Sequence, residues 1–208
     1  MAIATDNSAA VFETATLSFT VGNGTNRLLV VAIIGDTSDN ITAATYGIQS
    51  MTLIAKNQVP SVRYCYLYYL INPTSGTANI AVIGYAFPCF EVASYTGVKQ
   101  DVPDSSNSVT GTGVTTKTAS TTVVSSNCWL MSLVGTNNVS SGTISAGAGS
   151  FLRAVDSDGR QGLLDSNGTV GTGSQSLITN IAASANVSMI IASFAPAITN
   201  QGNMFQLF

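Results

Sequence analysis

The stretch that decides the fold is Leu28-Leu29-Val30-Val31-Ala32-Ile33-Ile34, which Gly35 follows. A run of this length, bounded by Gly and rich in β-branched residues, is typical of a strand rather than of a helix. Because no polar residue interrupts it, both faces of the strand must be covered by other parts of the protein. We therefore expect residues 28–34 to form a central core strand.

Shorter stretches with strand periodicity lie on both sides of this core strand. Between them stand turn-forming residues, and no window keeps the apolar spacing of a helix. The predicted strands are 17–21, 28–34, 41–46, 51–55, 62–70, 78–82, 90–95, 120–124, 128–134, 151–155, 162–164, 176–178 and 187–194. Many short strands joined by polar turns indicate an all-β fold, an antiparallel β-sandwich of jelly-roll type.

The middle of the chain, residues 100–116, consists almost entirely of Ser, Thr, Gly, Asp and Asn, and it is predicted to be a long loop. Such a loop suggests two domains, but each half would then hold only about 100 residues with unpaired strand edges, so one sandwich is favoured. No exact internal repeat is found. The expected organisation is a β-sandwich domain over 1–196 and a C-terminal extension over 197–208.

The composition excludes several classes of function. Charged residues make up 8% of the chain, the net charge is −3, and Lys and Arg do not cluster, so we expect no binding of nucleic acid. The longest apolar run is far shorter than the ~20 residues of a membrane-spanning helix, so no membrane partner is expected either. The first residues have neither a basic start nor an apolar run and do not resemble a secretory signal.

Catalytic residues are hard to find in this sequence. The chain has no His, which removes Ser-His-Asp and Cys-His catalysis and imidazole metal sites. A glycosidase needs two carboxyl groups, but nothing in the spacing of the candidates singles out a pair. We therefore expect no enzyme, no cofactor and no metal. The carboxyl candidates are Glu13, Glu91, Asp101, Asp156, Asp158 and Asp165.

Two further motifs have simple structural interpretations. Cys65, Cys89 and Cys128 are too few and too far apart for a disulfide framework, and they are expected to be buried as small apolar residues. The sequence from Asp156 to Gly159 resembles the start of a calcium loop, but the later ligands are missing. A hairpin turn between two strands is the favoured interpretation.

Two groups of apolar residues are candidate interaction sites. Tyr64, Tyr66 and Tyr68 lie on one face of the strand 62–70, where they could form a protein interface, a glycan-stacking platform or the covered inner face of the sandwich. The extension is apolar at its end. We expect it to dock on a neighbouring subunit or on another protein of the assembly through four anchors, which are Met204, Phe205, Leu207 and Phe208. The alternative is that it folds back on its own sandwich or is disordered.

The order of several strings resembles a β-sandwich module of phage virion proteins and secreted bacterial surface proteins. These strings are NRLLVVAI, TYGIQSMTLIA, YLYYLINPTSGTANIAV, EVASYTGVKQDVP and MIIASFAP. They describe strands and turns and carry no chemistry. The chain departs from the module at Ile48, where a second Gly is usual, and by continuing twelve residues past the usual end of the module.

The resemblance implies a bacteriophage structural protein that functions in the virion. Its first form is a capsid decoration or cement protein, assembled in the host cytoplasm as a homotrimer, whose partners are the major capsid protein and other copies of itself. Its alternative form is a lectin-like tail-fibre or surface domain that binds host glycans.

Overall fold

The computed structural model describes residues 1–137 and 143–198 and contains only strands, with no helix among these residues. The strands pair antiparallel in three sheets. The expected all-β sandwich fold is therefore confirmed.

The first 98 residues form a complete jelly roll of two sheets. Its five-stranded sheet has the order β1-β9-β3-β7-β6, and its four-stranded sheet has the order β2-β8-β4-β5. The strands are β1 (Ala4–Val11), β2 (Thr16–Val21), β3 (Leu28–Ile34), β4 (Ala43–Tyr46), β5 (Gln49–Ser50), β6 (Thr52–Gln58), β7 (Tyr64–Ile71), β8 (Gly76–Ile83) and β9 (Cys89–Thr96). β1 and β2 pair with β9 and β8, as in a long ribbon rolled into two layers.

The second half of the chain repeats this strand order in one folded sheet. Its strands are β10 (Ser105–Val123), β11 (Trp129–Thr136), β12 (Ile144–Ala146), β13 (Phe151–Val155), β14 (Gln161–Asp165) and β15 (Gly173–Phe194). β10 and β15 pair along most of their lengths, with register shifts between Gly111 and Thr116. The ribbon of β10 and β15 bends at this point. Residues 105–111 of β10 and 187–194 of β15 form one layer with β11, β14 and β13, and residues 116–123 of β10 and 173–181 of β15 form a second layer with β12.

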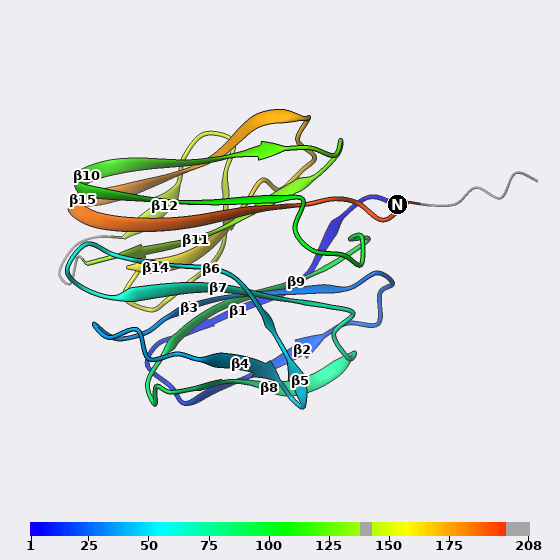
Figure 1. Ribbon diagram of the computed structural model, residues 1–208, viewed down its shortest axis with the longest axis horizontal. Coiled ribbons are helices and arrows are strands. Elements are labelled where there is room, and N and C mark those ends of the chain that lie inside the picture. Colours follow the sequence, from blue (N-terminus) through cyan, green and yellow to red (C-terminus); the bar gives the residue numbers. More distant parts are fainter. Residues whose placement is uncertain (138–142, 199–208) are drawn as a thin grey trace, which may run out of the picture.

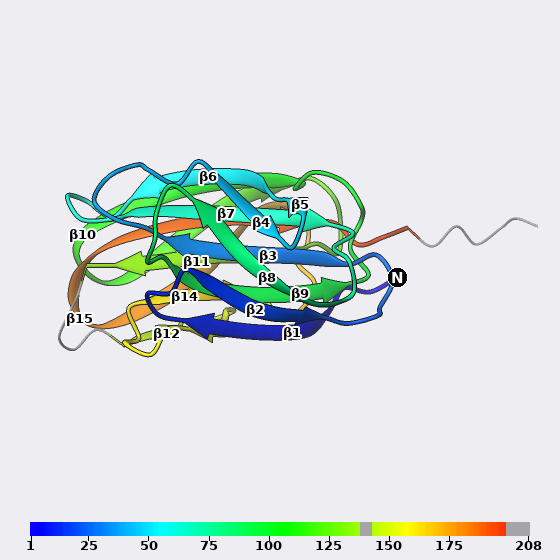
Figure 2. The ribbon, with the colours of Figure 1, turned by 90° about the horizontal axis from the view of Figure 1, so that it is seen from below.

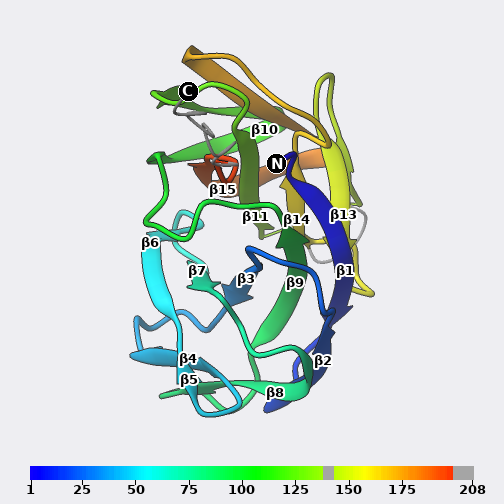
Figure 3. The ribbon, with the colours of Figure 1, turned by 90° about the vertical axis from the view of Figure 1, so that its right-hand side faces the viewer.

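The molecule therefore consists of two jelly rolls stacked through their larger layers, and Figure 1 shows the layers from the side. In the view from the right-hand end, β1 lies beside β13 on one side, and β6 lies below β10 on the other (Figure 3). The first strand of each roll, β1 or β10, thus lies against the strand at the far edge of the other roll's large layer, β13 or β6. The two rolls are therefore related by an approximate twofold axis that runs parallel to the strands between them.

Three apolar cores hold the layers together, one inside each roll and one between the rolls. β3 contributes to two of them, because Leu28 and Val30 point into the core between the rolls whereas Leu29 and Val31 point into the first roll's own core. Every residue of β3 is buried. The prediction that residues 28–34 are a central strand covered on both faces is confirmed, and the shared core joins the rolls into one packed unit.

The predicted long loop is the main error of the sequence analysis. Residues 105–116 belong to β10, which continues to Val123. Its outward positions are mostly Ser and Thr, and its inward positions include Gly111, Lys117 and Thr121, so the strand lacks the apolar alternation that the prediction required. The strand β1 was missed for the same reason, and the predicted strands 176–178 and 187–194 are two parts of the continuous β15.

Residues with positive φ angles occur at equivalent positions in the two rolls. Asn26 and Asn127 have left-handed φ angles of 53° and 60° two residues before the start of β3 and β11, a conformation that Asn tolerates better than most residues. Gly76 and Gly173 begin β8 and β15 with φ angles of 105° and 93°, which only Gly adopts readily. Gly76 pairs with Val21, and Gly173 pairs with Val123, so these pairs align the two rolls residue by residue.

A buried serine and a carboxylate close both rolls at the same place. In the first roll, the Asp6 carboxylate accepts hydrogen bonds from the Gly22 backbone N–H at 2.8 Å and from the Ser94 hydroxyl at 2.7 Å. In the second roll, Asp104 accepts one from the N–H of Val124, the residue equivalent to Gly22, at 2.7 Å. Each carboxylate therefore ties the end of one layer to the start of the other.

Candidate functional site

The core between the rolls contains a fully satisfied ionic site near the end where the N-terminus lies. Asp165 of β14 is buried, and its carboxylate accepts hydrogen bonds from Arg153 Nε at 2.7 Å and Arg153 Nη2 at 2.9 Å. The Tyr95 hydroxyl of the other roll donates to the same carboxylate at 3.0 Å. Burial, and then the nearby Asp165 charge, raise the pKa of Tyr95 well above its ordinary value, so the phenol remains a donor. This site joins the rolls.

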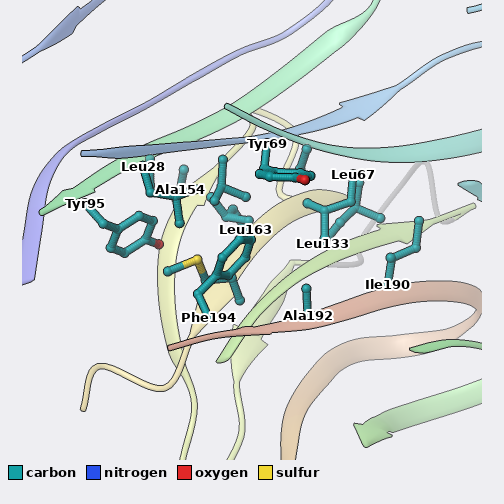
Figure 4. Packing of buried hydrophobic residues seen from close by; sticks show 14 of the residues in the cluster. Leu28, Leu67, Tyr69, Tyr95, Leu133, Ala154, Leu163, Ile190, Ala192 and Phe194 are labelled. Atoms are coloured by element: carbon teal, nitrogen blue, oxygen red, sulfur yellow. The ribbon is translucent and has the colours of Figure 1, made fainter. Parts of the chain in front are cut away.

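The twofold-related position contains an aromatic pair instead of an ionic site. Phe194 is equivalent to Tyr95, and Tyr69 is equivalent to Asp165, according to the strand registers. Their rings pack at a centroid distance of 5.9 Å (Figure 4). Ile54, in a β-bulge at the position equivalent to Arg153, packs against the same core.

A second polar cluster lies between the rolls and is not satisfied. Both carboxyl oxygens of Glu91 are buried and without a hydrogen-bond partner among the described residues, and so are Asp156 Oδ2 and both side-chain amide atoms of Gln161. Ser188 Oγ and Arg160 Nε are also without partners in this part of the structure. By strand register, Glu91 of the first roll is equivalent to Ile190 of the second. An ionisable residue in one roll therefore stands where the other roll has an apolar one.

Burial, together with the nearby Asp156 carboxylate, raises the pKa of Glu91 well above its ordinary value. Burial also raises the pKa of Asp156, against the effect of the backbone N–H groups of Arg160 and Gln161. The described structure thus brings together Glu91 and Asp156, two of the candidate carboxylates that are far apart in the sequence. They are 0% and 3% exposed, so a polysaccharide chain has no access to them in this conformation.

The tyrosine stripe does not form an exposed platform. Tyr66 and Tyr68 are 0% and 3% exposed and belong to the core between the two sheets of the first roll, and Tyr64 packs partly buried against that core. Of the three interpretations left open, the structure favours the covered inner face. The Tyr66 hydroxyl reaches the Asp39 carboxylate at 2.9 Å, beside its ion pair with Lys56.

Two grooves open on the surface near candidate residues. One of about 580 Å³ lies over Asp39, Lys56 and the edge of Tyr68, between the 39–43 segment and β6. The other, of about 630 Å³, lies beside the N-terminus, between Met1 and Ile198. The predicted tail anchors, Met204, Phe205, Leu207 and Phe208, lie outside the described residues.

The outermost layers on the two opposite sides of the molecule are nearly free of charge. They consist of β2, β4, β5 and β8 on one side, and of β12 with the outer halves of β10 and β15 on the other (Figures 1 and 2). Of the seven basic and ten acidic residues, only Lys117 lies in these strands. It is on the inward side of β10, with its side chain close to Gly111. Each outer surface is therefore a row of hydroxyl, amide and methyl groups.

Metal and thiol chemistry depend on where the Cys, Asp and Glu side chains lie. Within residues 1–137 and 143–198, no group of three or more His, Cys, Asp or Glu side chains is placed to hold a metal ion. The three cysteines are free and buried, as expected, and burial raises the pKa of Cys65 to about 12. The segment from Asp156 to Gly159 is the predicted hairpin turn between β13 and β14.

No helix of the described structure has the length and apolar character needed to cross a membrane. Comparison with known proteins gives no family: no protein-family model, no curated protein and no solved structure matches the chain.

Proposed function

We propose that this chain is a structural protein of a bacteriophage virion, a decoration or cement protein that binds the major capsid protein shell and performs no catalysis. The observation that supports this proposal best is the pair of nearly uncharged outer layers on opposite sides of one packed unit. Neutral, hydroxyl-rich surfaces form the wet, hydrogen-bonded contacts that join proteins repeatedly around a symmetric shell.

The construction of the core supports the same role. Two jelly rolls, an architecture used by viral capsid proteins and by lectins, share an apolar core and the buried Arg153–Asp165 pair. A protein that joins neighbours in a shell must transmit force between its two sides, and a continuous core does so without a hinge.

The test is the copy number of the protein in purified particles of the source phage. Quantitative mass spectrometry should find hundreds of copies per particle, and particles prepared without the protein should bind it when it is added back. About a dozen copies or fewer would contradict a role on the shell and favour a fibre. The same preparation, analysed by light scattering, tests the expected homotrimer.

The alternative is a lectin-like domain that binds host glycans. The observation that favours it is the groove of about 580 Å³, where Thr42, Thr52 and the Asp39–Lys56 pair offer donors and acceptors around the edge of Tyr68. A glycan array separates the two functions, because specific glycan binding that Asp39→Ala abolishes would favour the lectin.

A further inference from the structure

One strand of each roll's outer face carries the same outward side chains in the same places. With the rolls aligned at Gly76 and Gly173, the strand 16–21 of the first roll corresponds to 118–123 of the second. Their sequences are TLSFTV and TASTTV. The outward residues are identical, namely Thr16, Ser18 and Thr20 in the first-roll face and Thr118, Ser120 and Thr122 in the second-roll face.

Of the three inward positions of the same strands, one is identical, Val21 and Val123, and the other two differ. Phe19 corresponds to Thr121, and Leu17 corresponds to Ala119. Packing restricts inward positions strongly, because a change of one methylene group is felt in a core. Exposed hydroxyl groups contribute little to stability, since surface substitutions usually change it within ±0.5 kcal/mol. Stability therefore does not explain why all three outward residues match whereas two of the three inward residues differ.

The neighbouring strand extends each face with similar chemistry. In the first roll, Thr77 and Asn79 of β8 lie beside the row, and the Thr20 and Thr77 hydroxyls are 2.7 Å apart. In the second roll, Ser174 and Ser176 of β15 occupy the equivalent places. Both faces thus present neutral donors and acceptors on a flat, two-stranded surface.

Each face is too small to hold a partner alone. Two strands about 4.8 Å apart and about seven residues long cover roughly 230 Å², whereas a stable interface buries about 800 Å² on each partner. A stable dimer through one face is therefore not expected. Two weak, equivalent contacts made at once can hold the protein firmly on a surface that repeats, because the second contact is intramolecular.

We propose that the first-roll face and the second-roll face are two equivalent binding sites, with which one molecule bridges two copies of the same uncharged surface on neighbouring shell proteins. This inference rests on the proposed function. The decoration protein would then bind shell proteins with two opposite faces, an arrangement called here a two-sided clamp, and not with one face only.

The test uses particles of the source phage prepared without the protein and four variants added back. Ser18→Lys and Ser120→Lys place a charge at the centre of one face each, a double variant carries both, and Ser38→Lys puts the same charge on an exposed loop as the control. Each single variant should lower the apparent affinity by about 10²-fold or more and to a similar value. The double variant should not bind, and the control should bind as wild type.

The outcomes separate this inference from the proposed function. If wild-type protein does not bind the particles, both are wrong. If it binds and one single variant binds equally well, the shell role stands and the two-sided clamp is wrong. If light scattering shows that wild type alone forms chains that either variant breaks, the partner is a second copy of the chain and the inference is also wrong. Thermal melting of each variant verifies that it is folded.

Discussion

The twofold-related contacts between the rolls show how one backbone arrangement accepts opposite side-chain chemistry. At one position Tyr95 meets Asp165, which Arg153 neutralises. At the other, Phe194 meets Tyr69 in an aromatic pair. Strand register and the paired β-bulges fix the place of both contacts. The rolls therefore need a filled and satisfied position there, and a particular type of interaction is not required.

The largest effect is expected from breaking the ionic contact. Asp165→Ala leaves the Arg153 guanidinium and the Tyr95 hydroxyl inside the protein without their acceptor. Removing one partner of a buried pair costs about 3–5 kcal/mol, so the free energy of unfolding, measured with urea, should fall by this amount.

A second variant gives the ionic contact the same residues as the aromatic contact between Phe194 and Tyr69. Tyr95→Phe, Arg153→Ile and Asp165→Tyr together copy the aromatic site of the other position. This triple variant should recover most of the stability that Asp165→Ala loses, since an apolar replacement of a buried ion pair is often neutral or favourable. A triple variant as unstable as the single one would contradict the equivalence of the two contacts.

The next largest effect concerns the other difference between the rolls, Glu91 in place of the equivalent Ile190. Its pKa is raised in the folded protein, so the unfolded chain releases this proton at a lower pH than the folded one does. Wild-type stability should therefore decrease as the pH rises from about 4.5 through the folded-state pKa, by up to ~1.4 kcal/mol per pH unit. Glu91→Ile should remove most of this slope, leaving a smaller one from Asp156.

At pH 8, Glu91→Ile should be more stable than wild type by about 1–3 kcal/mol, because it removes a buried carboxyl group that lacks partners. Glu91→Gln serves as the control of similar size. It should flatten the pH dependence without the full gain, since its amide stays unsatisfied. Equal pH slopes in all three proteins, measured by urea unfolding between pH 4 and 9, would show that Glu91 does not cause the dependence.

A smaller effect tests the similarity of the rolls instead of their difference. Gly76→Ala and Gly173→Ala place a side chain at left-handed φ angles where no atom lies within 4 Å of the added Cβ. The loss is thus a backbone effect alone, about 1–2 kcal/mol at each site. Thermal melting should show equal shifts, about 2–4 °C per kcal/mol for a chain of this size. Shifts that differ twofold would mean that the two turns are not equivalent.

The smallest effect is expected from reductant. Cys65, Cys89 and Cys128 are free and buried, so a reducing agent has no bond to break. The melting temperature and the oligomer mass should not change, and a clear decrease of either in reductant would reveal a disulfide.

The strands that the sequence predicts best are those covered on both faces. Residues 28–34 were predicted to the residue, because a layer on each side requires apolar residues at every position. The outer layer of the second roll was predicted poorly, whereas β2 and β8 of the first roll were predicted within two residues at each end. β10 has mostly Ser and Thr at its outward positions and a bend with Gly in its middle, and each of these features is also typical of a loop.

The second roll was missed because its similarity to the first is local and short. The signals were in the sequence, in TLSFTV and TASTTV and in the strings VASYTG and IASFAP, each at the same place in its roll. The strand spacing differs between the halves, so no fixed period connects them. The buried Glu91 and Asp156 were both considered as carboxyl candidates, but their meeting depends on the packing of one roll on the other, which periodicity does not describe.

The position of β15 determines how this chain must fold as it is synthesised. β15 pairs with β10, β11 and β12, so the second roll cannot close before residue 194 has left the ribosome. The first roll can close once β9 has emerged, and its large sheet then presents Leu28, Val30 and Leu67 uncovered. At about 5–20 residues per second, the remaining hundred residues leave this apolar sheet open to other nascent chains for some 5–20 seconds in every round of translation.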